Sequence, residues 1–216
     1  MVSVLLSTYN GEKYIRESID SVLAQDRQDF ELLIGLNGTT DGTRKILETY
    51  KDSRIRIFDF GMDKGKGKTL NKLIKETKYE LLALQDDDDI WLPNKLSSQM
   101  WYTKMFDVVG SRVEYIDENG NRQGIPRIEI SHHDICNLSK IGNNQIPNTS
   151  AIFKKSKAIE IGGWREDIDG IEDYDFWLRL IRKGCIFFNH PDILVLHRLH
   201  SRSNFNTKKY DIWSIL

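Results

Sequence analysis

Four consecutive carboxylates, Asp86–Asp89, stand between two apolar stretches of the chain. They follow Leu81–Gln85, which has the composition of a short buried strand, and they precede Ile90 and Trp91. Acidic runs are more often solvated loops or tails, but those lie in polar surroundings. Because four like charges would repel one another at the end of a buried strand, this acidic run indicates a site for a cation.

A second group of carboxylates lies at Glu172, Asp173 and Asp175, directly before Phe176 and Trp177. The spacing of apolar residues predicts an amphipathic helix over 174–183. Carboxylates at the start of a helix interact favourably with its dipole, and for Asp175 helix capping is the preferred interpretation.

The stretch GMDKGKGKT, residues 61–69, follows a predicted strand and opens a predicted helix. A phosphate-binding loop of the Walker type has this context, but it needs four residues between its first glycine and the Gly-Lys-Thr. Five residues separate Gly61 from Gly67, which would change the backbone N–H groups that face a phosphate. An NTPase therefore remains only a minor alternative. A calcium loop fits less well, because Ile90 and Trp91 stand where glycine and oxygen ligands are needed.

Short apolar strands alternate with helices through the first half of the chain. Strands are predicted at 2–7, 30–36, 55–60 and 81–85, and helices at 12–25, 43–50, 69–75 and 93–105. This alternation predicts an α/β fold, with a mainly parallel sheet covered by helices on both faces. Ligands of such sheets bind beyond the carboxyl ends of the strands, so Tyr9, Asn37 and the acidic run are expected along one edge.

The second half is less regular. Strands are predicted at 108–116 and 146–153, a hairpin turn at 117–124, and a short helix at 155–161. Residues 124–147 are predicted to form a long polar connection. Because loops longer than about 12–15 residues are usually functional or mobile, this connection is expected to cover a site.

Four stretches together resemble the family 2 glycosyltransferases of the GT-A fold. VSVLLSTYNGEKYIRESIDSVLAQ is similar to the first strand, nucleotide loop and helix of that family, and FELLIGLNGTTDGT to its second strand and loop. LQDDDDIWLPNKL resembles its acidic metal motif, and GGWREDIDGIEDYDFWLRL its catalytic segment. The resemblance implies a single Rossmann-like GT-A domain over 1–216. Residues 1–105 would bind the nucleotide-sugar, and 106–216 would form a smaller, irregular acceptor-binding and catalytic half.

The resemblance also implies how the donor is held. The implied nucleotide-sugar contacts are Thr8, Tyr9, Asn10, Glu12, Asn37, Lys68, Asp86 and Asp87. Asp88 is the implied direct ligand of a divalent metal, Mn²⁺ or Mg²⁺, with Asp86 and His200 as further ligands. Such a cation neutralises the charge that accumulates on a diphosphate leaving group.

For the acceptor, the resemblance implies Asp173 as the general base and Glu172 and Trp164 as binding residues. A single displacement would invert the anomeric centre and need no covalent nucleophile. The expected function is a metal-dependent inverting glycosyltransferase. It would move a sugar from a nucleotide-diphospho-sugar, expected to be a UDP-sugar, to a saccharide or lipid-linked acceptor in the synthesis of surface polysaccharide or glycolipid.

Two positions depart from the family pattern. Asn37 stands where the family usually has Asp, and Leu70 where many relatives have Arg. An Asn carbonyl can still accept a hydrogen bond from N3–H of uracil or thymine. These departures motivate an alternative function, a non-catalytic nucleotide-binding scaffold. Lys64 and Lys66 are interpreted as solvated residues of a basic loop.

Composition places the chain among ordinary globular proteins. It has 31 basic and 32 acidic residues, so it has no field that would attract nucleic acid. The absence of a long apolar stretch and of a signal-peptide pattern, and two widely spaced cysteines, predict a cytoplasmic protein. The C-terminal segment NTKKYDIWSIL predicts either packing on the domain or a weak peripheral contact with the inner face of the membrane.

Overall fold

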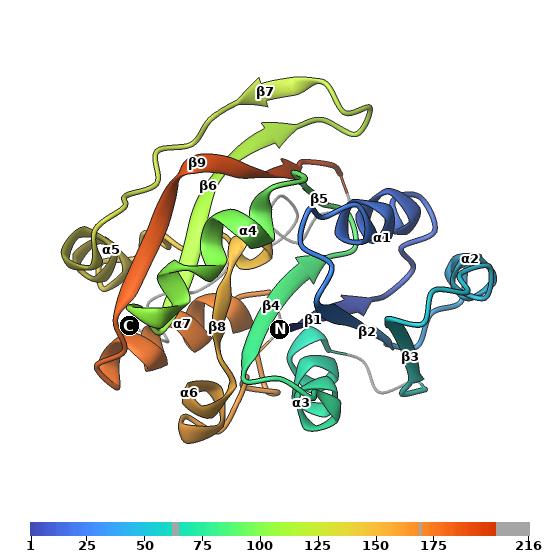
Figure 1. The fold of residues 1–216 in the computed structure, drawn as a ribbon, viewed down its shortest axis with the longest axis horizontal. Helices are drawn as coiled ribbons and strands as arrows, with labels where there is room; N and C mark the ends of the chain where they lie inside the picture. The colour runs from blue at the N-terminus through green and yellow to red at the C-terminus, as the bar shows by residue number, and fades with distance from the viewer. Residues whose placement is uncertain (62–64, 169, 202–216) are drawn as a thin grey trace.

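The computed structural model describes residues 1–61, 65–168 and 170–201. Within them nine strands form one sheet, in the order β3-β2-β1-β4-β8-β6-β9-β5, with β7 paired to β6 (Figure 1). The strands are β1 (Val2–Thr8), β2 (Phe30–Leu36), β3 (Ile55–Asp59), β4 (Leu81–Asp86), β5 (Ile90–Trp91), β6 (Val108–Ile116), β7 (Arg122–Gly124), β8 (Ile152–Lys154) and β9 (Phe187–Arg198). The helices are α1 (Ile15–Leu23), α2 (Thr43–Leu47), α3 (Lys66–Glu76), α4 (Lys95–Met100), α5 (His132–Ser139), α6 (Lys155–Glu160) and α7 (Glu172–Arg182), with 3-10 turns η1 (Tyr102–Lys104) and η2 (Asn148–Ser150).

The first four strands, β1–β4, are parallel to one another, as the alternation of strands and helices predicts. β1 pairs with β2 on one side and β4 on the other. Every residue of β2 is buried, and so is nearly all of β1, which explains their almost continuous apolar sequences. In this register Ser7 lies opposite Asp86, so the end of β1 is placed beside the start of the acidic run.

Helices cover both faces of the sheet and divide the core into two clusters. On one face α1, α2 and α4 contribute Ile19, Leu47 and Leu96 to a cluster with β1 and β2. On the other face α3, α5, α6 and α7 pack their apolar sides against the same strands and β4. The prediction of a sheet covered on both faces is confirmed.

Three predicted segments differ from the structure. Helix α3 begins at Lys66, three residues before the predicted start, so Lys66 and Lys68 are helical and are not part of a loop. Residues 124–147 are not a structureless connection, because they contain α5, whose Ser131 hydroxyl caps the N–H of Asp134. The strand predicted over 146–153 is divided into η2 and the short strand β8.

The last strand of the described chain returns to the acidic run. β9 lies parallel to β6, and its end pairs antiparallel with β5, so that Ile90 faces Leu196. Residues 197–200 are thereby brought to the carboxyl ends of β1 and β4. The chain contributes strands from both its halves to this one sheet.

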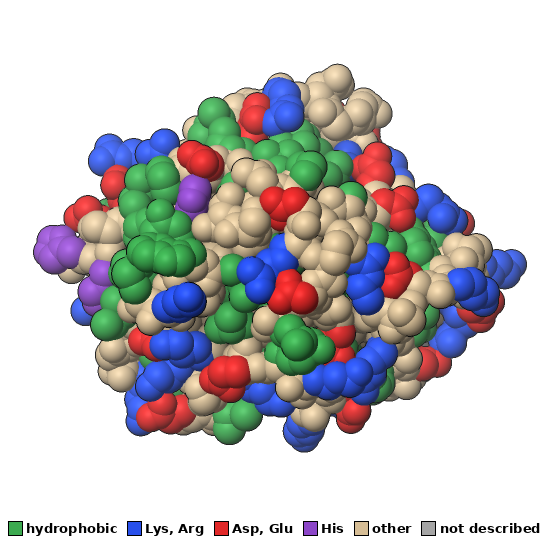
Figure 2. Space-filling view, in the orientation of Figure 1, with side chains coloured by type: hydrophobic (Ala, Val, Ile, Leu, Met, Phe, Trp, Pro, Cys, Tyr) green, Lys and Arg blue, Asp and Glu red, His purple; other side chains and the backbone are tan. Residues whose placement is uncertain are grey.

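Charged side chains of both signs lie on the face of the molecule that Figure 2 draws. Figure 2 shows acidic and basic side chains interspersed across one face, with hydrophobic side chains gathered toward its left side. Across the described residues, no helix has the length and apolar character that crossing a membrane requires.

Candidate active site

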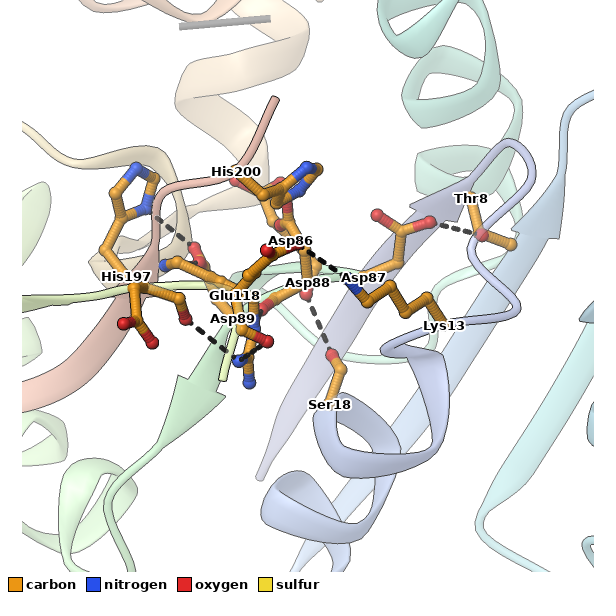
Figure 3. Close-up of polar contacts among 12 residues, drawn as sticks. Thr8, Lys13, Ser18, Asp86, Asp87, Asp88, Asp89, Glu118, His197 and His200 are labelled. Carbon is orange, nitrogen blue, oxygen red and sulfur yellow. Dashed lines mark hydrogen bonds and ion pairs between the residues drawn. The ribbon is translucent and has the colours of Figure 1, made fainter. Parts of the chain in front are cut away.

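The acidic run forms the tight turn between β4 and β5, and each of its four carboxylates binds a different partner. Figure 3 shows Thr8 beside Asp87 and His197 beside Asp89. The turn is held from below by α1, where the Ser18 hydroxyl donates to the carbonyl of Asp86 at 2.8 Å. The amide of Gln85 donates to Ser18 and to the Asp89 carbonyl. The run is therefore an ordered structure and not a solvated loop.

Asp86 accepts two hydrogen bonds at one carboxylate oxygen. Lys66 Nζ lies 2.5 Å from Asp86 Oδ1, and Asn148 Nδ2 lies 3.0 Å from the same atom. Lys66 reaches Asp86 because α3 begins early, which places this residue in the first turn of the helix. The interpretation of Lys66 as a solvated lysine is wrong. Lys64 lies outside the described residues.

Asp87 turns toward β1, where the Thr8 hydroxyl donates to its carboxylate. Burial and the charge of Asp88 raise the pKa of Asp87 to about 7, although the bond from Thr8 opposes this. Gly11 packs tightly on this pair, because a Cβ at Gly11 would lie 2.5 Å from Asp87 Oδ2. The predicted contacts Thr8 and Asp87 thus lie together.

Asp88 lies beside His200, the predicted partner in metal binding. His200 Nε2 is 2.8 Å from Asp88 Oδ2, and the His200 ring packs at 5.1 Å from the ring of Tyr14. Burial acts to raise the pKa of Asp88, but the hydrogen bond from His200 and the charge of His197 hold it below its ordinary value. Asp88 therefore ionises more readily in its surroundings than Asp87 or Asp89 does.

Asp89 is fully buried and fixes the end of β9. Its carboxylate contacts His197 Nδ1 at 2.9 Å and accepts the backbone N–H of Arg198 at 2.8 Å. Burial raises the pKa of Asp89 to about 6, although the charge of His197 opposes this. Arg198, also buried, donates to the carbonyl of Asp88 and to the carboxylate of Glu17. These contacts make Asp89 a structural member of the acidic run.

The carboxylates of α7 lie within the electrostatic reach of the same site. The charges of Asp86, Glu172 and Asp173 together raise the pKa of Lys66 above its ordinary value, although burial opposes this. Burial and the charge of Glu172 raise the pKa of Asp173 to about 7, while Lys66 lowers it. Lys66 therefore links the acidic run to the start of α7. Asp175 does not cap the helix through its side chain, which instead pairs with Arg179 at 2.7 Å.

The loops after β1 and β2 are joined by hydrogen bonds. Asn10, at a φ of 55°, accepts the N–H of Thr40 at 2.8 Å, and Glu12 accepts the N–H of Gly42 at 2.9 Å. Tyr9, at the end of β1, is 48% exposed. Asn37 is buried, and its Oδ1 has no hydrogen-bond partner among the described residues.

Two further predicted site residues are Trp164 and Lys68. Trp164 is 2% exposed and its ring stacks on Phe176 at 4.3 Å, so it is a core residue in this structure. Its backbone is held by Asn71, which accepts from the Trp164 N–H and donates to its carbonyl. Lys68 lies in α3 and its stem packs near Gly65. The C-terminal segment predicted to meet a membrane lies outside the described residues.

The residues present suit a divalent cation only in part. Among residues 1–61, 65–168 and 170–201, no three His, Cys, Asp or Glu side chains are placed together to hold an ion. Asp88 and His200 nevertheless offer a carboxylate and an imidazole at one point. Mg²⁺ is commonly bound by one or two carboxylates together with substrate phosphates, and imidazole suits transition metals. This donor set fits a cation whose remaining ligands come from a diphosphate.

Sequence reasoning missed Lys66, Asn148 and Arg198 at this site. Asn148 meets Asp86 across 62 positions of the chain, and Arg198 meets the Asp88 carbonyl across 110. No local pattern marks either residue. For Lys66 a signal was present, because a glycine, Gly65, directly precedes it and permits the backbone (φ 129°) from which the helix starts.

The fold is an α/β fold whose polar site lies at the carboxyl ends of its parallel strands. The glycosyl transferase family 2 model matches residues 3–162. An uncharacterized glycosyltransferase of Methanocaldococcus jannaschii is 30% identical over 99% of this chain and 77% of its own length. The O-antigen biosynthesis glycosyltransferase WbnJ of Escherichia coli is 30% identical over 94% of this chain and 81% of its own. The chain belongs to glycosyl transferase family 2.

Solved structures show the same fold. S. aureus TarS in complex with UDP-GlcNAc has a TM-score of 0.79 at 21% identity, over 97% of this chain and 61% of that one. The mannosyltransferase PcManGT from Pyrobaculum calidifontis, in complex with GDP-Man and Mn²⁺, has a TM-score of 0.70 at 20% identity, over 94% and 58%. The chain thus spans about three fifths of these two proteins, and the predicted GT-A fold is confirmed.

Proposed function

We propose that this protein is an inverting, metal-dependent glycosyltransferase that uses a UDP-sugar. The observation that carries the proposal is the position of Lys66, which binds Asp86 directly and lies close enough to Asp173 for the two charges to act on each other. It brings a carboxylate with a pKa of about 7 near the place where a diphosphate would be bound. Sugar transfer must stabilise the leaving group and remove a proton from the acceptor. In this proposal, residues for both steps lie at one site.

The donor half of the proposal rests on the edge formed by β1, β2 and β4. Asp88 and His200 would hold Mn²⁺ or Mg²⁺, which when bound stabilises negative charge on a diphosphate as a Lewis acid. Asp87 and Thr8 would meet the ribose, and Tyr9 would stack on the base. Lys66 adds a fixed positive charge beside Asp86, where it would offset charge on the leaving group.

The acceptor half rests on the start of α7. Asp173 would accept the proton of an acceptor hydroxyl as that oxygen attacks the anomeric carbon from the face opposite the diphosphate. A general base is most effective when its pKa lies near the working pH, and the partly buried position of Asp173 beside Glu172 raises its pKa to about 7. Glu172, whose carboxylate is held by the N–H of Gly170, would bind acceptor hydroxyls.

The printed names of two relatives support the proposed class of acceptor. WbnJ is named for O-antigen biosynthesis, and an Erwinia amylovora relative, AmsE, for amylovoran biosynthesis. We infer a saccharide or lipid-linked acceptor in the synthesis of a surface polysaccharide. Cys136 and Cys185 are both free and buried, which supports a reducing, cytoplasmic compartment.

A second candidate is a nucleotide-binding scaffold without catalysis. Leu70 favours it, because this residue is buried in the core where many relatives carry an arginine. Lys66, one helical turn earlier on α3, would supply a positive charge in its place. We therefore prefer the enzyme.

Calorimetric titration of the full chain with UDP, with and without Mn²⁺, tests the proposal. UDP should bind, and Mn²⁺ should tighten the binding. Asp173→Asn should bind UDP as the wild type does but release UDP from UDP-hexoses about 10²–10⁴-fold more slowly with acceptor present, the usual contribution of a general base. Failure to bind UDP, GDP and dTDP would refute both candidates, whereas binding without turnover by the wild type would favour the scaffold.

A further inference from the structure

The side chain of Asn37 is a buried amide whose oxygen is unused by the fold. Asn37 is 6% exposed, and Oδ1 has no hydrogen-bond partner among the described residues. Its backbone N–H donates to the carbonyl of Thr8 at 3.0 Å, and the Thr8 hydroxyl donates to Asp87. Asn37 therefore lies on the edge that carries the acidic run, one strand beyond Thr8.

This position suits the base of a nucleotide whose diphosphate lies at the acidic run. On one side of the run, Asp86 faces Lys66 and Asn148, and the carboxylates of α7 act on Lys66. The nucleoside would then extend the other way, across the ends of β1 and β2. Asn37 is the buried polar side chain at the end of β2, and its unpaired acceptor there can take a donor from a ligand.

An amide and a carboxylate read the edge of a pyrimidine differently. Ionised Asp has only acceptors, so it can pair with N3–H of uracil but meets the N3 lone pair of cytosine unfavourably. Asn has an acceptor and two donors in one plane. In one orientation its oxygen accepts from N3–H of uracil while its NH₂ donates to O4. Turned by 180°, its NH₂ donates to N3 of cytosine while its oxygen accepts from the exocyclic amine.

We propose that Asn37 allows this site to bind cytidine diphosphates as well as uridine diphosphates, and that it sets this tolerance. The inference deepens the proposed function and rests on it. None of the described residues donates to Asn37 Oδ1, so a turn of the amide breaks no hydrogen bond of that oxygen within the described structure. Because Asn37 is neutral, it also adds no negative charge to an edge that already carries Asp86–Asp89.

Titration calorimetry of the full chain with UDP, CDP and GDP, at one fixed concentration of Mn²⁺, tests the proposal. The wild type should bind UDP and CDP with dissociation constants that differ by less than about tenfold, and GDP more weakly than both. Asn37→Asp should retain UDP and weaken CDP by about tenfold or more, which is the usual effect of one mismatched base-edge contact. Asn37→Ala should weaken both pyrimidine nucleotides alike.

Asn137→Asp, on the exposed side of α5, makes the same change of charge away from the site and should leave all three affinities unchanged. Thermal unfolding of each variant checks that the variant is folded. If Asn37→Asp does not fold, Asn37→Ala still tests whether Asn37 pairs with the base. Wild-type preference for UDP beyond tenfold, or an unchanged UDP-to-CDP ratio in Asn37→Asp, would overturn the inference and leave the proposed function intact. So would GDP binding as tight as that of CDP. Binding of no nucleotide would overturn both.

Discussion

At the scale of single residues, one ammonium group serves two sets of carboxylates. Lys66 binds Asp86 directly, and its charge lowers the pKa of Asp173, which burial and Glu172 raise. A base must be ionised to accept a proton, so kcat/KM should rise with pH through a pKa of about 7. Lys66 thus keeps Asp173 more ionised at neutral pH than its burial alone would allow.

Lys66→Gln should shift this rise in activity to higher pH. Removing the positive charge removes the effect that lowers the pKa of Asp173, so less of the base is ionised at a given pH. The measurement is a profile of kcat/KM from about pH 5 to 9. Lys75→Gln, at the exposed far end of the same helix, loses the same charge and should keep the wild-type profile. An equal drop at every pH in Lys66→Gln would show that Lys66 acts only on the donor.

At the scale of elements, α4 carries a lysine with no ion-pair or hydrogen-bond partner in the described structure. Lys95 is fully buried, its Nζ lacks an acceptor, and it lies 4.0 Å from the centre of the Trp91 ring. Burial lowers its pKa well below the ordinary value. At pH values between the folded-state and the unfolded-state pKa, the unfolded chain binds a proton that the folded protein releases. This lysine therefore makes folding less favourable as pH falls below about 10.

Lys95→Met should stabilise the protein at pH 7 by about 1–3 kcal/mol, the usual cost of an unsatisfied buried polar group. The gain should shrink as pH approaches about 10, because the unfolded-state lysine then loses its proton too. Urea unfolding at several pH values measures both effects, with Lys140→Met, on the surface after α5, as the control. Destabilisation at every pH would mean that the contact with Trp91 outweighs the burial of the amine.

Strand β9 is fixed to the acidic run through a histidine whose charge the fold favours. Burial opposes the charge, but Asp89 raises the pKa of His197 to about 9. A raised pKa in the folded state contributes stability that is complete below about pH 6.5 and is lost as pH rises through about 9. The free energy of unfolding, measured with urea, should fall between these pH values with a slope that corresponds to at most one proton. In His197→Gln this fall should be absent. An unchanged slope between these pH values would contradict the ion pair with Asp89.

The features of the fold and site that could be predicted depend on residues close together in the sequence. Those that were missed depend on contacts between residues far apart in the sequence. Val2–Thr8 and Phe30–Leu36 could be predicted because a fully buried parallel strand must be apolar along its length. Helix α5 was missed because its exposed side is polar and only residues such as Ile135 reach the core. The acidic run could be located, but the assignment of each carboxylate to a partner could not. Those partners come from α3, η2 and β9, and only the folded sheet brings them together.

At the scale of the whole molecule, donor and metal should stabilise the fold together more than either does alone. The four carboxylates of the acidic run already have protein partners, so a cation alone gains little by entering, while a diphosphate supplies the ligands that are missing. At a concentration of UDP one hundred times its dissociation constant, binding adds about 2.7 kcal/mol. For a chain of this size that is an increase in Tm of about 5–11 °C. This increase in Tm is measured by thermal unfolding with UDP, with Mn²⁺, and with both. If Mn²⁺ alone raised Tm as much as the two together, the metal site would be complete without the diphosphate.

The pairing of the acidic run with residues 197–200 also orders the events of synthesis. The ribosome makes the acidic run more than one hundred residues before His197, Arg198 and His200, which contact it across 108 to 112 positions. Until those residues emerge, the nascent chain carries four adjacent carboxylates. The basic side chains at the end of β9, which would offset their negative charge, have not yet been made. The parallel strands β1, β2 and β4 can pair earlier, since all of their residues are already present. The candidate active site is therefore among the last parts of the described chain that can be completed, and a ribosome that stalls before β9 would leave a partial sheet without a finished site.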